Sequence, residues 1–369
     1  MKLKLEVLKK HLEDALHTIS RISDKNLSLP VLGCIVITVS PSHTTLKATN
    51  LDVSAEINLK SKILSDGVVA IPAPIFSQVI MAHADEKITL ESDDGTLKII
   101  GSHGETKLKS VDPTDFPSLP YVKKGEGVSL LLPTKDLVRA FKGVSFASAT
   151  TGIRPELSSV FLSISENTLI AAATDSFRLA EIKIPLKTKQ AAHTPLLIPT
   201  RNIPDIIKII DTADMVEIRA SENQITCIAD GNYITSRIVD GAFPEYGAII
   251  PKSFTTSLTM LAGDVAGALK KVSVVADQTG QIELSVNGAE KKVFIKGINT
   301  NVGEVYESLD AVIDGDDVVM YFNARYILDA LNVVGSDSVV FRFSGAGKPL
   351  IIGETPEKGF TYLVMPMNK

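Results

Sequence analysis

The stretch IPAPIFSQVI, residues 71–80, decides the fold because its pattern occurs twice more along the chain. Its counterparts are IPTRNIPDII at 198–207 and FNARYILDAL at 322–331, so successive copies lie about 125 residues apart. In each copy a strand end leads into Pro or Asn, and apolar residues at helical spacing follow. Proline suits the first turn of a helix because its missing N–H has no intrahelical partner there. The pattern therefore indicates a structural unit repeated three times.

Other segments recur with the same offset. LEVLKKHLEDAL at 5–16 is answered by LPTKDLVRAF at 132–141 and LAGDVAGALKKV at 261–272, and ATNLDVSAEI at 48–57 is echoed by ATDSFRLAEI at 173–182. Short turns separate the intervening strands, and their Asp-Gly and Asn-Gly pairs are hairpin signals. These turns are SPSH at 40–43, SDDG at 92–95, SEN at 165–167 and 221–223, NG at 287–288 and SGAG at 344–347.

These repeats predict an α+β fold of three tandem domains, each with two helices packed on mostly antiparallel sheets. The phenylalanine-proline pairs at 116–117 and 243–244 end a strand in the first two copies. The domains are accordingly expected at residues 1–122, 127–250 and 251–369.

Composition narrows the class of protein. The chain has 369 residues, 44% hydrophobic and 22% charged, which is typical of a globular protein with real cores. No apolar run approaches the ~20 residues of a membrane span, and the N-terminus shows no export signal. Cys34 and Cys227 lie in apolar runs far apart and are expected to be buried thiols rather than a disulfide or a metal site. We expect a cytoplasmic protein with no membrane partner.

The segment TDSFRLA, residues 174–180, places an acid, hydroxyls, an aromatic ring and an arginine between two strand-like runs. A turn between strands, an active site and a docking pocket are the three possible explanations. Catalysis would use Asp175 and Arg178 with Ser176 as nucleophile, but such a serine needs a nearby activating base. None of the six histidines lies in a nucleophile elbow, and GxxxxGK[ST], HExxH and CxxC motifs are absent from the sequence. We therefore predict no enzymatic activity and no cofactor.

Charge is distributed unevenly. The net charge is −5, yet the predicted helices carry more basic than acidic side chains. If the helices of a tandem repeat share one side, they form a basic surface within an acidic protein. Such a surface would suit nucleic acid, because phosphates attract Lys and Arg without regard to base sequence.

Taken together, the triplicated units, TDSFRLA, FPEYGAIIP at 243–251 and the C-terminal YLVMPMNK resemble the bacterial sliding-clamp family, the beta subunits of DNA polymerase III. The resemblance runs along the whole chain. It implies domains of the processivity fold and a head-to-tail homodimer that closes into a six-domain ring around duplex DNA. Its implied partners are the replicative polymerase catalytic subunit, the clamp-loader ATPase and other clamp-motif proteins. A scaffold ring that binds peptides but no DNA is the remaining alternative.

The resemblance also assigns residues. Ser176-Phe177 and Gly247-Ala248 depart from the family's usual Gly-His and basic pair, which predicts a more apolar and less cationic pocket. DNA-facing residues are Lys9, Lys10, Lys25, Arg139, Lys142, Arg201, Lys208, Lys270 and Lys271. The partner-peptide pocket comprises Leu157, Thr174, Phe177, Arg178, Leu179, Pro244, Ala248, Ile249, Val364, Met365, Pro366 and Met367, with Leu179 and Met365 as walls and Arg178 at the polar edge. The dimer interface comprises Leu108, Ser273 and Val274.

Overall fold

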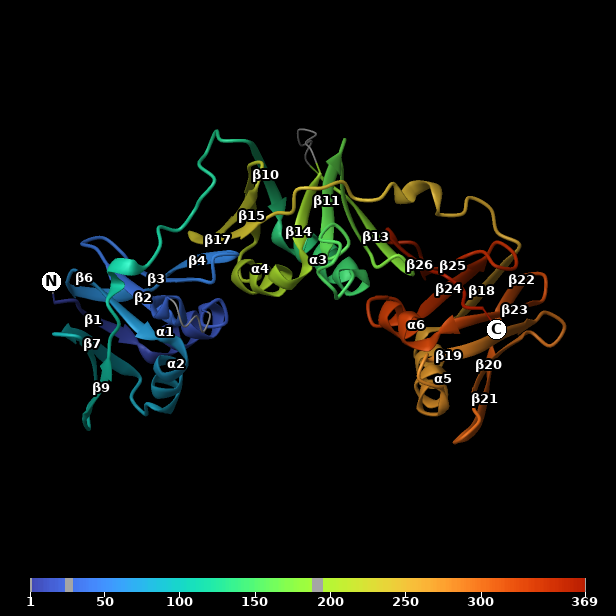
Figure 1. Ribbon diagram of the computed structural model, residues 1–369, viewed down its shortest axis with the longest axis horizontal. Coiled ribbons are helices and arrows are strands. Elements are labelled where there is room, and N and C mark those ends of the chain that lie inside the picture. The colour runs from blue at the N-terminus through green and yellow to red at the C-terminus, as the bar shows by residue number, and fades with distance from the viewer. Residues whose placement is uncertain (1, 24–28, 188–194, 369) are drawn as a thin grey trace. The chain divides into compact units, whose positions relative to one another are not determined.

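A computed structural model of the chain describes residues 2–23, 29–187 and 195–368. The chain forms two compact units, and the ribbon of each is shown in Figure 1. Unit 1 comprises Met1–Leu137 and Arg201–Ile238, and unit 2 comprises Val138–Thr200 and Val239–Lys369. In the described part of the chain, no helix combines the length and the apolar character needed to cross a membrane.

Unit 1 contains two antiparallel sheets. The five-stranded sheet has the order β5-β1-β7-β8-β9, and the eight-stranded sheet has the order β10-β15-β16-β17-β4-β3-β2-β6. Their strands are β1 (Lys4–Leu8), β2 (Cys34–Val39), β3 (Thr44–Thr49), β4 (Val53–Asn58), β5 (Ser61–Ser65), β6 (Gly67–Pro72), β7 (Lys87–Asp93), β8 (Thr96–Ile100), β9 (Glu105–Lys109), β10 (Val128–Pro133), β15 (Met215–Ala220), β16 (Gln224–Ala229) and β17 (Asn232–Arg237).

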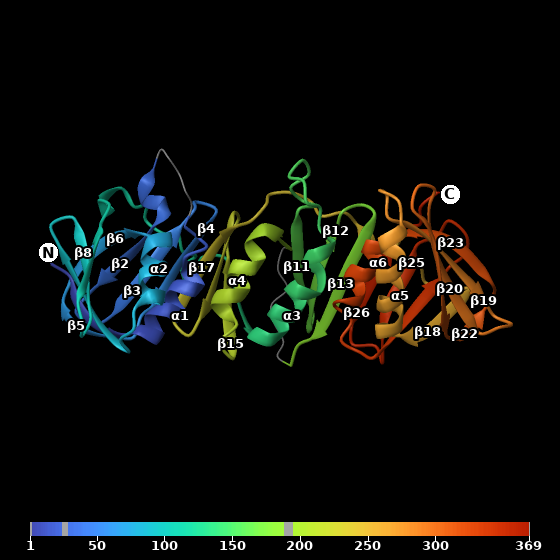
Figure 2. The same ribbon diagram turned by 90° about the horizontal axis from the view of Figure 1, so that it is seen from below.

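The helices of unit 1 are α1 (Lys9–Ile19), α2 (Ala73–Ala82) and α4 (Ile203–Ile210). Helix α1 buries Leu12, Ala15, Leu16 and Ile19, which is one face of a 3.6-residue period. It packs on β3 and β4, while α4 packs on β16 and β17, and the two helices touch. Both therefore cover one face of the eight-stranded sheet, as Figure 2 shows.

Unit 2 also contains two antiparallel sheets. The nine-stranded sheet has the order β14-β11-β12-β13-β26-β25-β24-β18-β22, and the four-stranded sheet has the order β21-β20-β19-β23. Their strands are β11 (Ser159–Ser165), β12 (Thr168–Thr174), β13 (Arg178–Pro185), β14 (Leu196–Pro199), β18 (Thr256–Leu261), β19 (Gln281–Asn287), β20 (Lys292–Asn299), β21 (Gly303–Asp310), β22 (Val312–Gly315), β23 (Val318–Asn323), β24 (Ser338–Phe343), β25 (Leu350–Thr355) and β26 (Phe360–Val364).

The remaining helices are α3 (Thr134–Val144), along which the chain passes from unit 1 into unit 2, α5 (Ala262–Val275) and α6 (Ala324–Leu331). Helices α5 and α6 touch, and α6 packs on β23 and β26. The Asn323 side chain caps α6 by accepting hydrogen bonds from the N–H groups of Arg325 and Tyr326 at 2.9 and 3.4 Å.

The predicted elements are confirmed. A helix lies in each of the six segments singled out by the repeat, and each predicted turn connects two paired strands. Cys34 and Cys227 are both buried and free. Each large sheet also crosses from one sequence repeat to the next, through β4–β17 in unit 1 and β13–β26 in unit 2.

Candidate partner-binding and nucleic-acid-binding surfaces

The segment 174–178 is a tight turn between β12 and β13. The Asp175 Oδ1 atom accepts hydrogen bonds from the N–H groups of Phe177 and Arg178 at 2.9 and 3.0 Å. The Thr174 hydroxyl donates to the Arg178 carbonyl at 2.6 Å and accepts from the Ser176 N–H at 3.2 Å. Ser176 adopts a positive φ of 80°. The short polar side chains therefore shape the turn, as the turn hypothesis predicted.

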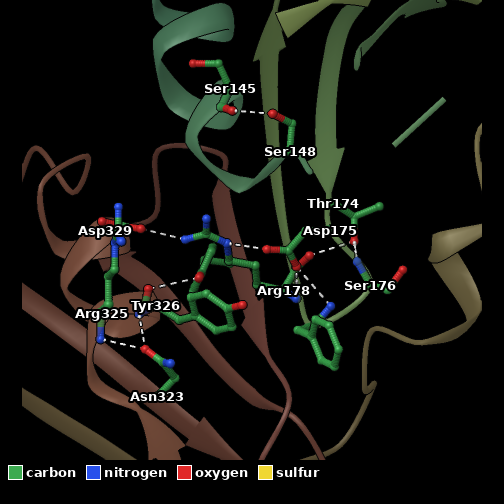
Figure 3. Close-up of polar contacts among 12 residues, drawn as sticks. Ser145, Ser148, Thr174, Asp175, Ser176, Arg178, Asn323, Arg325, Tyr326 and Asp329 are labelled. Atoms are coloured by element: carbon green, nitrogen blue, oxygen red, sulfur yellow. Dashed lines mark hydrogen bonds and ion pairs between the residues drawn. The ribbon is translucent and has the colours of Figure 1, made fainter. Parts of the chain in front are cut away.

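The Arg178 side chain is buried, with 9% of its surface exposed. Its Nε atom donates to Asp175 Oδ2 at 2.9 Å and its Nη1 atom to Asp329 Oδ2 at 2.6 Å, and its guanidinium lies 4.4 Å from the centre of the Tyr326 ring (Figure 3). Burial alone would lower the pKa of Arg178, but the hydrogen bond to Asp329 and the charge of Asp175 raise it, so the group stays ionised. The Arg178 side chain is thus buried and joins β13 to α6.

Three segments distant in sequence meet beside this turn. Strand β13 pairs with β26 so that Arg178 lies opposite Val364 and Leu179 opposite Leu363. The pairing extends one step further, since the Met365 N–H donates to the Phe177 carbonyl at 2.9 Å. Leu179, Leu363 and Ile351 form a buried cluster, against which Tyr246 and Ile250 of the third segment pack. The three segments that the family resemblance brings together therefore lie side by side, with Leu179 buried beneath the surface.

The predicted pocket residues differ in how much of their surface is exposed. Phe177, Ile249 and Met365 expose 62%, 51% and 38% of their surface, and we call these three the apolar patch. Pro244 and Ala248 are also exposed and Pro366 is half-buried, whereas Leu157, Thr174 and Val364 are buried. Met367 is directed elsewhere, because its N–H donates to the Tyr321 carbonyl of β23 at 2.7 Å.

Sequence reasoning missed the tyrosine that fixes the third segment. The Tyr246 hydroxyl donates to Glu181 Oε2 at 2.8 Å, and its ring lies 5.9 Å from that of Phe243. Burial, together with the negative charge of Glu181, raises the pKa of Tyr246. An aromatic residue inside FPEYGAIIP was the available signal, but nothing in the sequence identified its partner on β13.

The basic residues of the helices lie on the expected elements, and many of them already have partners. Lys9 pairs with Glu13 at 3.3 Å, Lys10 with Asp14 at 2.8 Å, Arg201 with Asp52 at 2.6 Å and Lys271 with Glu307 at 3.1 Å. Arg139 donates to the Lys358 carbonyl at 2.7 Å, and Lys208 donates to the His17 carbonyl. Lys142 and Lys270 are exposed and form no ion pair with any described residue. Lys25 lies outside the described residues.

Family models of the DNA polymerase III beta subunit match the chain in three consecutive parts. The N-terminal, central and C-terminal domain models match residues 3–120, 131–245 and 247–368. The chain belongs to the DNA polymerase III beta subunit family. The family resemblance inferred from the sequence is therefore confirmed.

Individual members of the beta subunit family show the same similarity. Proteins named beta sliding clamp from Synechocystis sp. and Synechococcus elongatus are 28% and 26% identical to this chain over 99% of both sequences. The solved DNA polymerase sliding clamp of Bacillus subtilis gives a TM-score of 0.93 at 24% identity, with 100% of each chain covered. That of Pseudomonas aeruginosa, solved bound to griselimycin, gives a TM-score of 0.93 at 21% identity with the same coverage. The predicted fold of three tandem clamp domains is confirmed.

The residues expected at a dimer interface lie on or near two sheet edges. Strand β9, at one edge of the five-stranded sheet, contains Leu108, which is 9% exposed and pairs with Leu97. Helix α5 places Ser273 and Val274 beside β21, which is an edge of the four-stranded sheet. Val274 is 81% exposed, while the Ser273 hydroxyl donates back to the Leu269 carbonyl at 2.6 Å. Among the described residues, no cluster of His, Cys, Asp and Glu could hold a metal ion.

Proposed function

We propose that two copies of this chain form a ring that encloses duplex DNA and tethers replication proteins to it. The observation that carries the proposal is the match to all three beta-subunit domain models along one chain. The ring works in the cytoplasm, slides without reading base sequence and has no catalytic activity of its own. Its partners are the replicative polymerase catalytic subunit, the clamp-loader ATPase and other proteins with a clamp-binding peptide. Its domains comprise residues 1–122, 127–250 and 251–369.

The absence of catalysis is supported by the turn at 174–178. The Asp175 carboxylate is engaged by two backbone N–H groups and by Arg178, and Arg178 is engaged by Asp329. The Ser176 N–H bonds the Thr174 hydroxyl, and Ser176 has no His or Lys among its hydrogen-bond partners in the described residues. A serine nucleophile needs such a base, so these groups are suited to holding a turn.

The ring closes through the free edges of β9 and β21. Two edge strands can continue a sheet across a subunit boundary because each has unpaired backbone groups. Their exposed side chains are partly complementary in charge, since β9 carries Lys107 and Lys109 while β21 carries Glu304 and Asp310. Lys107 already pairs with Glu105 at 2.9 Å and Glu304 with Lys296 at 3.0 Å, so these two pairs must exchange partners across the boundary. Val274 from one copy, which is 81% exposed, supplies most of the apolar contact, and Leu108 from the other adds the 9% of its surface that is exposed. The arrangement is heterologous, so it closes into a ring only if its rotation permits.

Phosphates bind the basic helix residues. Lys142 and Lys270 are free to meet them directly, and Lys9, Lys10 and Lys271 exchange a carboxylate for a phosphate. Arg201 keeps its bond to Asp52 through Nη2 while its other N–H groups meet a phosphate. Such exposed pairs contribute at most about 1 kcal/mol, so the exchange costs little. Contacts of this kind attract the duplex without base readout, which suits a protein that must move along DNA.

Partner peptides bind on the apolar patch. Phe177, Ile249 and Met365 come from three converging segments, and the flexible Met365 side chain adapts to different ligands. Burying two or three peptide side chains there contributes roughly 1.5–3 kcal/mol each before ordering costs, which predicts an affinity near micromolar. Partners held at that affinity exchange readily.

Retention on circular DNA tests the ring. The protein, opened and closed by a clamp loader, should remain on nicked circular DNA and be lost after linearisation, and its mass in solution should be that of two chains. Retention on linear DNA, or a monomeric mass at the loading concentration, contradicts the proposal.

Charge reversal tests the DNA-facing surface. Replacing Arg139, Lys142, Lys270 and Lys271 by Glu should abolish processive synthesis. The slope of log K for DNA binding against log salt concentration should become shallower by about 0.9 for each phosphate contact that is lost. Lys123→Glu with Lys124→Glu, in an exposed connecting segment, is the matched control and should be silent. Full processivity of the fourfold variant would refute the assignment.

Substitution of the apolar patch tests peptide binding. Deleting Met365–Lys369 should abolish binding of a peptide from the polymerase catalytic subunit, and Phe177→Asp should weaken it at least tenfold. Ile153→Asp, at a residue 86% exposed in the same unit, is the control and should have no effect. Unchanged peptide affinity in the deletion variant would mean that the 174–178 segment is a turn and nothing more.

A further inference from the structure

Unit 1 contains a second copy of the turn that borders the apolar patch. Asn50 Oδ1 accepts from the N–H groups of Asp52 and Val53 at 3.1 and 2.8 Å, as Asp175 does from Phe177 and Arg178. The Thr49 hydroxyl donates to the Val53 carbonyl at 2.9 Å and accepts from the Leu51 N–H at 3.0 Å. Leu51 has a φ of 73°, close to the 80° of Ser176. The two turns are equivalent bond for bond.

The strand pairing beyond the turn is equivalent too. In unit 1, β4 pairs with β17, and the Arg237 N–H donates to the Asp52 carbonyl at 3.0 Å, as the Met365 N–H does to the Phe177 carbonyl at 2.9 Å. Unit 1 therefore contains a counterpart of the surface that carries the apolar patch, with other side chains. Asp52 stands where unit 2 has Phe177, Ser54 where it has Leu179, Thr235 where it has Leu363, and Arg237 where it has Met365.

A cavity of about 420 Å³ opens at this counterpart surface, and we call it the polar cavity. Its size falls within the range of small-ligand and peptide side-chain sites. Asp52, Arg237, Asn223 and Gln224 supply its polar lining, and Leu51 and Ile238 supply apolar contact. Every lining residue belongs to unit 1.

The charge of the polar cavity is decided by which groups already have partners. Asp52 Oδ2 accepts from Arg201 Nη2 at 2.6 Å, so this carboxylate is compensated. The exposed Arg237 side chain pairs with no carboxylate among the described residues. The cavity consequently presents an uncompensated guanidinium, which favours an anionic group with two acceptor oxygens.

We propose that the polar cavity is a second docking site, which takes an extended peptide segment carrying a carboxylate. The side-chain amides of Asn223 and Gln224 can both donate to and accept from a peptide backbone, and Leu51 and Ile238 accommodate a neighbouring aliphatic side chain. Nucleic acid fits less well, because a single free arginine beside Asp52 offers little to a continuous row of phosphates. The site needs only unit 1, so it does not depend on ring closure or on the apolar patch.

A titration with the full chain tests the proposal. The probe is the synthetic peptide Ac-Leu-Glu-Leu-Glu-Leu-NH2, and the control probe replaces both Glu residues by Gln. We expect the Glu peptide to bind and to lose about tenfold in affinity in Arg237→Ala and Arg237→Gln, since a charge-assisted hydrogen bond is removed. Phe177→Asp and Arg342→Ala, both in unit 2, should leave its affinity unchanged.

Several outcomes would overturn the proposal. Equal binding of the Glu and Gln peptides, or equal binding by parent and both Arg237 variants, removes the role of the guanidinium. Loss of binding in Phe177→Asp moves the peptide to the apolar patch. Displacement by inorganic phosphate at a concentration equal to that of the peptide indicates a general anion site, and displacement by a short DNA duplex indicates a nucleic-acid site. Loss of polymerase-peptide binding or of retention on circular DNA bears on the proposed function and leaves this site untouched.

Discussion

The turns at 49–53 and 174–178 have the same backbone hydrogen bonds. They differ in their last residue, which begins the next strand. In unit 1 that residue is Val53, which is 1% exposed and has no charge to compensate. In unit 2 it is Arg178, held by Asp175 and Asp329 and stacked on Tyr326. The turn is set by short-range bonds from its own polar side chains, so it tolerates either residue. The side chain at this position is a separate feature: a buried valine on the strand that pairs with β17 in unit 1, and a buried arginine in an ion pair with α6 in unit 2.

The largest expected effect comes from giving unit 2 the residue of unit 1. Arg178→Val leaves the Asp175 and Asp329 carboxylates without their partner, and breaking a buried pair in this way costs about 3–5 kcal/mol. Urea unfolding followed by circular dichroism measures the loss, because the chain contains no tryptophan. Arg342→Val is the control, since its pair with the exposed Glu357 at 2.8 Å should contribute below about 1 kcal/mol. Equal losses in the two variants would show that burial of the Arg178 pair has no energetic consequence.

The turn caps should differ by a smaller amount. Asn50→Ala and Asp175→Ala each remove the acceptor of two backbone N–H groups, which costs about 1–2 kcal/mol. Asp175→Ala should cost about 1 kcal/mol more, because Asp175 also accepts from Arg178 Nε. Asp175→Asn separates the two contributions, since its amide oxygen keeps the turn bonds and loses the charge. If Asn50→Ala proves the more harmful variant, the ion pair does not stabilise the turn of unit 2.

Glycine at the left-handed position should stabilise both turns. Leu51 at a φ of 73° and Ser176 at 80° occupy a region that costs non-glycine residues roughly 1–2 kcal/mol. Glycine avoids this strain, but its more flexible unfolded state offsets part of the gain in stability. We expect Leu51→Gly and Ser176→Gly to gain up to about 1 kcal/mol each, visible as a rise in Tm of about 2–4 °C. A lowered Tm in both would mean that the turns do not store strain.

Thiol labelling gives the smallest signal and reports on one unit alone. Both cysteines of the chain lie in unit 1, and burial raises the pKa of Cys34 to about 11 and that of Cys227 to about 12. Each thiol is therefore protonated at pH 8, and slow labelling should speed up as the pH rises, at Cys34 first. Asn50→Ala should speed labelling at pH 8 by opening unit 1, whereas Arg178→Val should not. Fast labelling of Arg178→Val would show that breaking the ion pair of unit 2 also opens unit 1.

Local features could be predicted from the sequence, and long-range pairing could not. Helix α2, which begins at Ala73 within the stretch 71–80, was recognisable from its proline and its apolar spacing. The role of Asp175 followed from the tendency of Asp to accept hydrogen bonds from nearby N–H groups. The burial of Arg178 was not recognisable, since its partner Asp329 is 151 residues away and either residue alone resembles a surface charge. The same holds for Tyr246 and Glu181, which are 65 residues apart.

The sequence itself relates the two turns. ATNLDVSAEI and ATDSFRLAEI are equivalent segments of the first two repeats, but the family resemblance assigns a function to the second alone. The polar substitutions at Asp52 and Ser54 conceal the equivalence from any search for apolar pockets. The matched hydrogen bonds of the two turns reveal this equivalence, because the backbone geometry is the same although the side chains differ in character.

The continuous sheets that cross from one repeat to the next have a consequence for how such a chain can evolve. Strand β4 pairs with β17 and strand β13 with β26, so the first and the second repeat each have a strand edge that the following repeat covers. A gene that lost one repeat would encode a protein with a bare edge, which invites pairing with other chains and aggregation. The lower solubility expected of such a shortened product would therefore oppose the loss of a repeat.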